Sequence, residues 1–388
     1  MNHAIIAACI EIGKTYTVWN PMKIRLGPLH AKRRAMFGKL ALWLLKRAPA
    51  PVFKPETIKK VLFLRDNDKF GDLIVSTIAI RELKRAGKQV DVIAGLRNAE
   101  LLRLNPHVDQ LHVHNDKLFS VIKLALKLRK EKYDLLIDLR NEVPTYKDIV
   151  LMSWSKVRHV IGFNRELYPV FDVNLKEDFS LNQHAAWRNF ALLEALRIDC
   201  KDCNRHYDVH IDSVEEEKVR TYLKNLPKQR TLLINLKGEG PFRRLDQAQL
   251  DAILDYMQSN YSGWNIVLTA KQEDLDGINT VGMQKSPFKT YFAAVALVKH
   301  ADVVISPDTS IVHAAAAFDK PLLALYEKDR TSCYLNSRAW GPNNSRAIMV
   351  QSDEFSVYTI PTTALVKGLD QVMGNARSQA GRSHDLAN

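Results

Sequence analysis

Residues 61–72 read VLFLRDNDKFGD, an apolar strand that runs into a polar loop and ends at a glycine–aspartate pair. A helical pattern follows, so Gly71 allows a tight turn and Asp72 lies where the helix starts. An aspartate there is often only a helix cap. However, residues 303–313, VVISPDTSIVH, repeat the same strand–loop–helix order in the other half of the chain. Because ligands of parallel sheets bind at the carboxyl ends of strands, the two loops together predict a substrate site.

Apolar runs alternate with helical patterns from residue 58 onward, which is typical of parallel sheets with crossover helices. In the first half we expect strands at residues 61–65, 90–94, 111–114, 135–139 and 159–163, and helices at 73–86, 98–104, 119–130, 146–154 and 189–196. After a polar transition at 200–230, we expect strands at 232–236, 265–268, 303–306 and 322–326, and helices at 246–258, 291–299, 310–318 and 362–373. The pattern predicts an α/β protein with two Rossmann-like domains, residues 58–205 and 206–373, and a cleft between them.

The two ends of the chain differ from this core. Residues 1–57 carry much of the net charge of +13 and form a basic extension that three prolines between residues 49 and 55 close off. A helix is expected at 35–48, with lysines at every seventh position from residue 32 to 46. It could pack on the first domain or lie on an anionic membrane, and the sequence leaves both open. Residues 374–388 are expected to be a disordered tail.

Composition excludes several classes of protein. No apolar run reaches the roughly 20 residues that span a bilayer, and no signal-peptide pattern opens the chain, so export is not expected. The four cysteines are too few and too scattered for a disulfide framework, which favours a reducing compartment. Cys200, Cys203, His206 and His210 have a spacing only loosely like a zinc site, and residues 206–211 alternate like a strand. No nucleic-acid-binding motif accompanies the basic charge.

Two segments of the second half are suited to an anionic ligand. Thr309 and Ser310 start a helix and offer N–H groups and hydroxyls to a diphosphate, while Asp308 either caps that helix or contacts sugar hydroxyls. His313 lies one turn further, as a core histidine or part of the same site. Residues 237–244, KGEGPFRR, add a glycine-bearing loop with two arginines, which is either a phosphate-binding loop or a solvated basic one.

The order of these segments resembles glycosyltransferase family 9, the bacterial lipopolysaccharide heptosyltransferases. The similarity covers roughly residues 58–373 and includes RDNDKFGD at 65–72, IGF at 161–163, DTSIVHAA at 308–315 and the Lys320–Pro321 turn. It implies a GT-B fold and an inverting, metal-independent transfer of heptose from ADP-heptose to the lipopolysaccharide inner core, without a cofactor.

The resemblance also implies roles for single residues. Asp72 corresponds to the family's catalytic base. The acceptor is expected near the rest of its loop, namely Arg65, Asn67, Asp68, Lys69 and Gly71. The donor is expected near Arg243, Arg244, Asp308, Thr309, Ser310 and His313, with Glu273, or alternatively Asp274, at the ribose. The chain departs from the family's pattern at Leu245, Ser310 and Glu327.

The expected partners are a nucleotide-sugar donor, a lipopolysaccharide core acceptor and the anionic surface of the inner membrane, with no nucleic acid. The expected location is cytoplasmic and peripheral on that membrane. Three alternatives stay open: transfer of another nucleotide-activated sugar, a non-catalytic nucleotide-binding protein, and a protein that binds nucleic acid through its basic surface. A nicotinamide-dependent oxidoreductase is disfavoured because no G-x-G-x-x-G follows residues 61–65.

Overall fold

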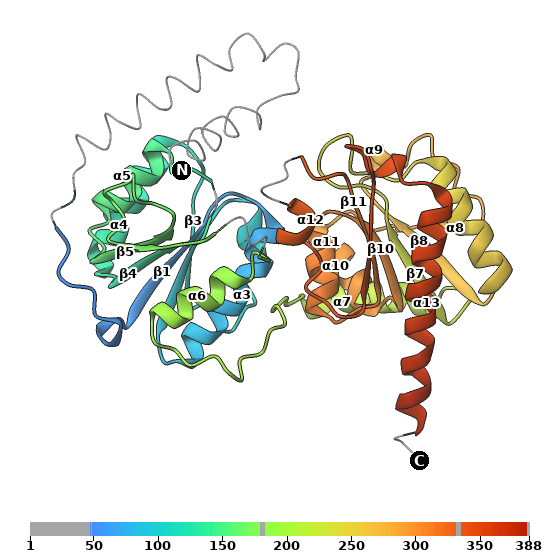
Figure 1. The fold of residues 1–388 in the computed structure, drawn as a ribbon, viewed down its shortest axis with the longest axis horizontal. Helices are drawn as coiled ribbons and strands as arrows, with labels where there is room; N and C mark the ends of the chain where they lie inside the picture. Colours follow the sequence, from blue (N-terminus) through green and yellow to red (C-terminus); the bar gives the residue numbers. More distant parts are fainter. Residues whose placement is uncertain (1–46, 48, 141, 179–182, 331–334, 386–388) are drawn as a thin grey trace, which may run out of the picture.

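The computed structural model describes residue 47 and residues 49–140, 142–178, 183–330 and 335–385. The helix expected at residues 35–48, and with it most of the basic extension, lies outside the described residues. The described chain forms two α/β domains, each built on its own sheet (Figure 1). None of the helices in the described ranges combines the length and hydropathy that crossing a bilayer requires.

The N-terminal sheet is parallel, with strand order β3-β2-β1-β4-β5-β6. The strands are β1 (Lys60–Arg65), β2 (Gln89–Ala94), β3 (Gln110–Val113), β4 (Leu135–Asp138), β5 (His159–Phe163) and β6 (Val173–Leu175). The helical segments are η1 (Pro55–Thr57), α3 (Phe70–Arg85), η2 (Asn98–Leu102), α4 (Leu118–Glu131), α5 (Tyr146–Trp154) and α6 (Trp187–Ala195). Strand order reverses between β1 and β4, so the loops that follow these two strands flank the switch point where ligands bind in such sheets.

The C-terminal sheet repeats the same design in the order β12-β11-β10-β7-β8-β9. Its strands are β7 (Arg230–Asn235), β8 (Trp264–Thr269), β9 (Gln284–Lys285), β10 (Val303–Pro307), β11 (Leu322–Tyr326) and β12 (Ala347–Gln351). Its helical segments are α7 (Ser213–Lys224), α8 (Gln247–Asn260), α9 (Gln272–Leu275), α10 (Tyr291–His300), α11 (Ser310–Ala317), α12 (Asn336–Ala339), η4 (Val357–Thr359) and α13 (Thr362–Asp385). Here the switch point lies between β7 and β10, and the loops expected to hold phosphate follow these two strands.

The two domains share one hydrophobic cluster. It includes buried side chains of α3 and α6 from the first domain and of α10 and α11 from the second. The short alanines Ala314, Ala315 and Ala316 are almost fully buried and let α11 lie close to its surroundings. The packing of α3 against α11 therefore sets the start of each helix near the other.

Four expectations from the sequence are wrong. Residues 200–230 contain helix α7, which Asp212 caps through its side chain, and residues 206–211 form no strand. Helix α13 continues past residue 373 to Asp385, although Gly374 lowers its helix propensity. Cys200 and Cys203, three residues apart in the segment between the domains, form a disulfide. The low number of cysteines had led us to expect none.

Candidate active site

The two loops singled out in the sequence meet at the domain interface. A Cβ atom added to Gly71 would lie 3.0 Å from Cδ2 of His313 and 3.7 Å from Cα of Ser310. Next to this contact, the rings of Phe70 and Tyr291 stack at 4.0 Å between centroids. Gly71 is thus required for close approach, and the start of α3 lies against the start of α11.

Asp72 is partly buried and is the third residue of α3. The helix has Lys69 at its N-cap, and no side chain there forms a capping hydrogen bond. The carboxylate of Asp72 instead accepts a hydrogen bond from Nδ2 of Asn67 at 2.9 Å. Its hydrogen bonding therefore does not match that of a simple N-cap, and the side chain is held by its own loop.

Glu142, in the loop after β4, is a neighbour that the sequence analysis missed. Its Oε1 lies 2.7 Å from Nζ of Lys69 and 3.4 Å from Nδ2 of Asn67. Burial alone would raise the pKa of Glu142, but Lys69 outweighs this effect and lowers the pKa to about 2. Burial alone would lower the pKa of Lys69, but Asp72 and Glu142 outweigh this effect, so the pKa of Lys69 is raised. Asn67 thus lies between two carboxylates, one of which also pairs with the Lys69 ammonium group. Only the strand order, with β4 beside β1, brings Glu142 to this place.

Beneath the loop, Asp66 joins three strand ends. Its carboxylate lies 2.6 Å from Nη1 of Arg140 and 3.1 Å from Nε2 of His114. Arg140 is buried and also pairs with Asp138 and Asp148. Burial lowers the pKa of His114, but the hydrogen bond to Asp66 outweighs it and the net pKa is raised. This cluster fixes the ends of β1, β3 and β4 relative to one another.

Two of the expected acceptor residues make structural contacts. Asp68 has a φ of 55°, and its Oδ1 accepts a hydrogen bond from the backbone N–H of Arg97 at 2.8 Å. Arg65 is 4% exposed and donates through Nε to Oγ of Ser76 at 2.7 Å. Both residues hold the loop in shape. Of the five acceptor residues expected from the sequence, Asn67 donates to the carboxylate of Asp72, and the charge of Asp72 acts on both Arg65 and Lys69.

In the C-terminal domain, the glycine loop packs on the turn before α11. A Cβ at Gly238 would lie 2.6 Å from Cγ2 of Thr309 and 3.1 Å from the carbonyl oxygen of Asp308. The loop closes on itself, with the N–H of Gly238 donating to the carbonyl of Arg243 at 2.6 Å. Residues 237–244 and 308–310, far apart in the sequence, therefore form one structure at the switch point between β7 and β10.

Arg243 lies between two carboxylates of this structure. Its Nη1 is 3.1 Å from Oδ2 of Asp308, and its Nη2 is 3.6 Å from Oε1 of Glu327. Nδ2 of Asn336 also donates to Asp308 at 3.0 Å. Burial raises the pKa of Asp308, with Arg243 acting in the opposite direction. Glu327, one of the departures from the family pattern, is thus a direct partner of the arginine expected to bind phosphate.

Thr309 and His313 face inward. Oγ1 of Thr309 accepts hydrogen bonds from the N–H of Ile311 at 3.1 Å and from Nδ2 of Asn235 at 3.2 Å, so this hydroxyl caps α11. His313 is 3% exposed, burial lowers its pKa to about 3, and its Nδ1 has no hydrogen-bond partner among the described residues. It contacts Tyr207 and Trp340 edge to face. Ser310, at the first position of α11, remains the residue best placed to present an N–H group.

The remaining donor candidates, Glu273, Asp274 and Arg244, differ in their contacts with the glycine loop. Glu273 is exposed and lies 3.7 Å from Lys271, whereas Asp274 pairs with Lys237 of the glycine loop. Arg244 is exposed, and its backbone bridges to that of Lys237. Asp274, the alternative to Glu273, is therefore the acidic residue in contact with the loop.

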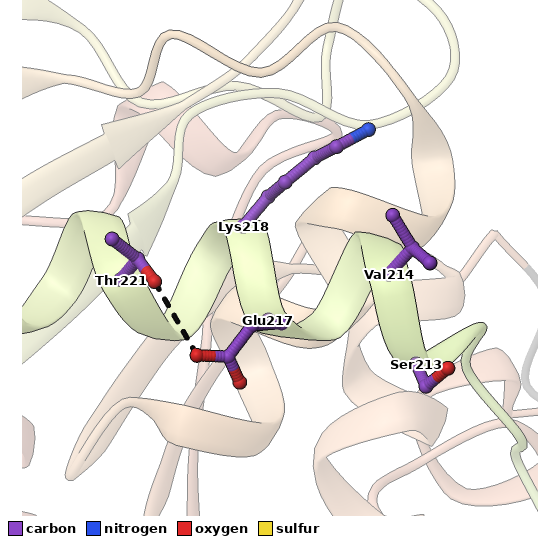
Figure 2. A pocket seen from close by; sticks show the side chains of 5 residues that line it. All are labelled: Ser213, Val214, Glu217, Lys218 and Thr221. Atoms are coloured by element: carbon purple, nitrogen blue, oxygen red, sulfur yellow. Dashed lines mark hydrogen bonds between the residues drawn. The ribbon is translucent and has the colours of Figure 1, made fainter.

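A shallow depression on the outer side of α7 offers no competing site. Figure 2 shows Ser213, Val214, Glu217, Lys218 and Thr221 along it, with the Thr221 hydroxyl donating to Glu217 at 3.4 Å. These side chains all come from one helix and do not converge on a common point. The switch points of the two sheets remain the candidate active site.

Comparison with known proteins agrees with this architecture. The family model described as glycosyltransferase family 9 (heptosyltransferase) matches residues 121–357. The candidate lipopolysaccharide heptosyltransferase 4 of Escherichia coli K12 is 27% identical over 355 residues, which cover 90% of this chain and 98% of that protein.

Two solved structures share the fold. The family 9 glycosyltransferase of Veillonella parvula superposes with a TM-score of 0.68 at 16% identity, covering 83% of this chain and 98% of that one. The ADP-heptose lipopolysaccharide heptosyltransferase II of Escherichia coli gives a TM-score of 0.63 at 18% identity, covering 81% and 98%. Since the family model spans more than half of the sequence, the chain belongs to glycosyltransferase family 9, the heptosyltransferase family.

Proposed function

We propose that this protein transfers heptose from ADP-heptose to the inner core of a lipopolysaccharide, with inversion at the anomeric carbon and without a metal ion. Family membership and the ADP-heptose-dependent relative of the same fold support the donor and the acceptor. The observation that carries the proposal is the contact of Gly71 with Ser310 and His313, because it brings the carboxylate-bearing start of α3 to the start of α11.

In this proposal each domain has one task. Residues 58–205 hold the acceptor, and Asp72 takes the proton from its attacking hydroxyl as the bond to the anomeric carbon forms. Residues 206–373 hold the donor, and the departing diphosphate is stabilised by Arg243 and by the N–H of Ser310 at the positive end of α11. The base and the leaving group lie on opposite domains, which suits attack from the face opposite the diphosphate.

The chemistry of the acidic residues supports a reaction without a metal ion. Asp66 and Asp68 form the Asp-x-Asp pair closest to Asp72 in the sequence. Both oxygens of Asp66 are already engaged, by Arg140 and His114, and Oδ1 of Asp68 accepts from backbone N–H groups. Charge-assisted contacts of this kind supply the stabilisation that a cation would otherwise give these carboxylates.

The test is incubation of the purified protein with ADP-heptose and truncated core oligosaccharides, with products identified by mass spectrometry. We expect a mass increase of one heptose, an anomeric configuration opposite to that of the donor by NMR, and an unchanged rate in EDTA. Transfer only from another nucleotide sugar would overturn the proposed donor, retention would overturn the stereochemistry, and loss of activity in EDTA would overturn the metal-independent mechanism.

A further inference from the structure

Helix α4 carries apolar side chains on two opposite faces. Val121, Leu124, Ala125 and Leu128 are buried against the N-terminal sheet. On the other side, Phe119 is 87% exposed and Leu126 is 47% exposed. Their positions differ by seven residues, so both lie on the same outward stripe of the helix. We call the outward residues Phe119, Lys123, Leu126, Lys127 and Lys130 the α4 outer face.

The charge of this face has one sign. Lys123, Lys127 and Lys130 are exposed, and none of them forms an ion pair among the described residues. The one acidic residue of the helix, Glu131, pairs with Lys60 at 2.8 Å. Asp116, just before the helix, pairs with Lys147 of α5. The exposed stripe therefore combines large apolar side chains with unpaired cations.

The position of α4 relates this face to the candidate active site. The helix follows β3, so its first turn, with Phe119, lies at the carboxyl edge of the sheet where the loop of Asp72 also lies. Nζ of Lys147 donates to the carbonyl of Asp116 at 2.7 Å and fixes this end of α4 to the start of α5. Val143, in the loop before α5, is 65% exposed at the same edge. The start of the face, with Phe119, thus lies at the same edge of the sheet as the Asp72 loop.

We propose that the α4 outer face binds the surface of an anionic lipid bilayer. Phe119 and Leu126 enter the interfacial region, and the three lysines contact the lipid head groups, as in helices that lie on membranes. Charge complementarity favours an anionic bilayer as the partner, since each of the three lysines is attracted to an anionic surface and the face carries no acidic residue. The inference rests on the proposed function in one respect, because a lipid-anchored acceptor would then reach the Asp72 edge without leaving the membrane.

The α4 outer face is distinct from the surface that Arg47 contacts. The described root of the extension, Arg47, lies 3.2 Å from Asp172 and donates to the carbonyls of Val157 and Val170. These residues precede β5 and β6, so Arg47 lies at the amino edge of the sheet, opposite the Asp72 loop. Substitutions on α4 therefore test a surface other than the one that Arg47 contacts.

The experiment measures binding of the full-length protein to vesicles of phosphatidylcholine with and without phosphatidylglycerol, by sedimentation. The variant Lys123→Gln/Lys127→Gln/Lys130→Gln should lower partitioning onto anionic vesicles by on the order of 100-fold, which corresponds to about 1 kcal/mol per lysine. Phe119→Ser/Leu126→Ser should also weaken binding. The charge-matched control Lys218→Gln/Lys224→Gln/Lys285→Gln, on the exposed surface of the C-terminal domain, should bind as the parent protein does.

Binding of both α4 variants within threefold of the parent would overturn the proposal, as would equal loss in the control. An extension variant, Lys32→Gln/Lys39→Gln/Lys46→Gln, shows whether the extension also contributes. The α4 variants should keep the parent's heptose transfer to a water-soluble core oligosaccharide and lose it for an acceptor embedded in vesicles. If no heptose is transferred by any of these proteins, the proposed function fails, while the vesicle measurement still decides whether α4 binds lipid.

Discussion

Replacing Gly238 by alanine should disrupt the donor side of the site. The added methyl group would lie 2.6 Å from Cγ2 of Thr309, 3.1 Å from the carbonyl oxygen of Asp308 and 3.2 Å from Cβ of Arg243. Carbon atoms in contact are ordinarily about 3.5–4.0 Å apart, so the loop and the turn must separate by about 1 Å. Overpacking of this kind costs about 1–3 kcal/mol. If the whole cost falls on donor binding, ADP binds roughly 5- to 150-fold more weakly.

Calorimetric titration with ADP and thermal unfolding of Gly238→Ala provide the assay. The control is Gly263→Ala, because a methyl group there would meet no atom within 4 Å and the backbone has no left-handed φ. We expect the control to match the parent protein in both measurements. A Gly238 variant that binds ADP as the parent does would refute the assignment of this loop to the donor, even if its melting temperature falls.

Three further predictions follow from the same contacts. Arg243→Ala should weaken ADP binding by about 1.5–3 kcal/mol through loss of a charge-assisted phosphate contact, and equal affinity by calorimetry would show that the arginine does not face the donor. Glu142→Gln should lower kcat by about tenfold with ADP affinity unchanged, since Lys69 is then free to pair with Asp72 and make its carboxylate a weaker base; steady-state kinetics that show only a raised KM would contradict this role. Because the pKa of His114 is raised in the fold, its pairing with Asp66 stabilises the protein fully below the unfolded pKa of about 6.5, and this contribution is lost as pH rises through the folded pKa. When pH rises from 6 to 8.5, the free energy of unfolding in urea should therefore fall less for His114→Gln than for the parent protein. An equal fall for both proteins would rule out this coupling.

The periodicity of the sequence was sufficient for most of the fold. Apolar runs such as residues 61–65 and 322–326 coincide with strands β1 (Lys60–Arg65) and β11 (Leu322–Tyr326). What it missed were elements with few apolar residues. Helix α7 buries only Val219, and β9 and β12 are short or half exposed, so their apolar signal is weak.

The sequence indicated which loops form the candidate site, but not which side chains contact one another there. The loops of Asp72, Arg243 and Asp308 could be found because helix starts and glycine turns have local signatures. Glu142 and Asn336 could not, because their proximity depends on strand order and on packing between segments far apart in the sequence. The same limit applies to Thr309, whose hydroxyl serves the cap of α11 and the side chain of Asn235.

The central claim is that Asp72 is the base of a glycosyl transfer and not a structural cap. Its most direct test is the turnover of Asp72→Asn with ADP-heptose and a core acceptor, measured beside ADP affinity. We predict a fall in kcat of about 100- to 10,000-fold, with ADP binding within a few-fold of the parent. Asp255→Asn, on the exposed side of α8, is the matched control and should behave as the parent does. Turnover of Asp72→Asn within tenfold of the parent protein would contradict the account.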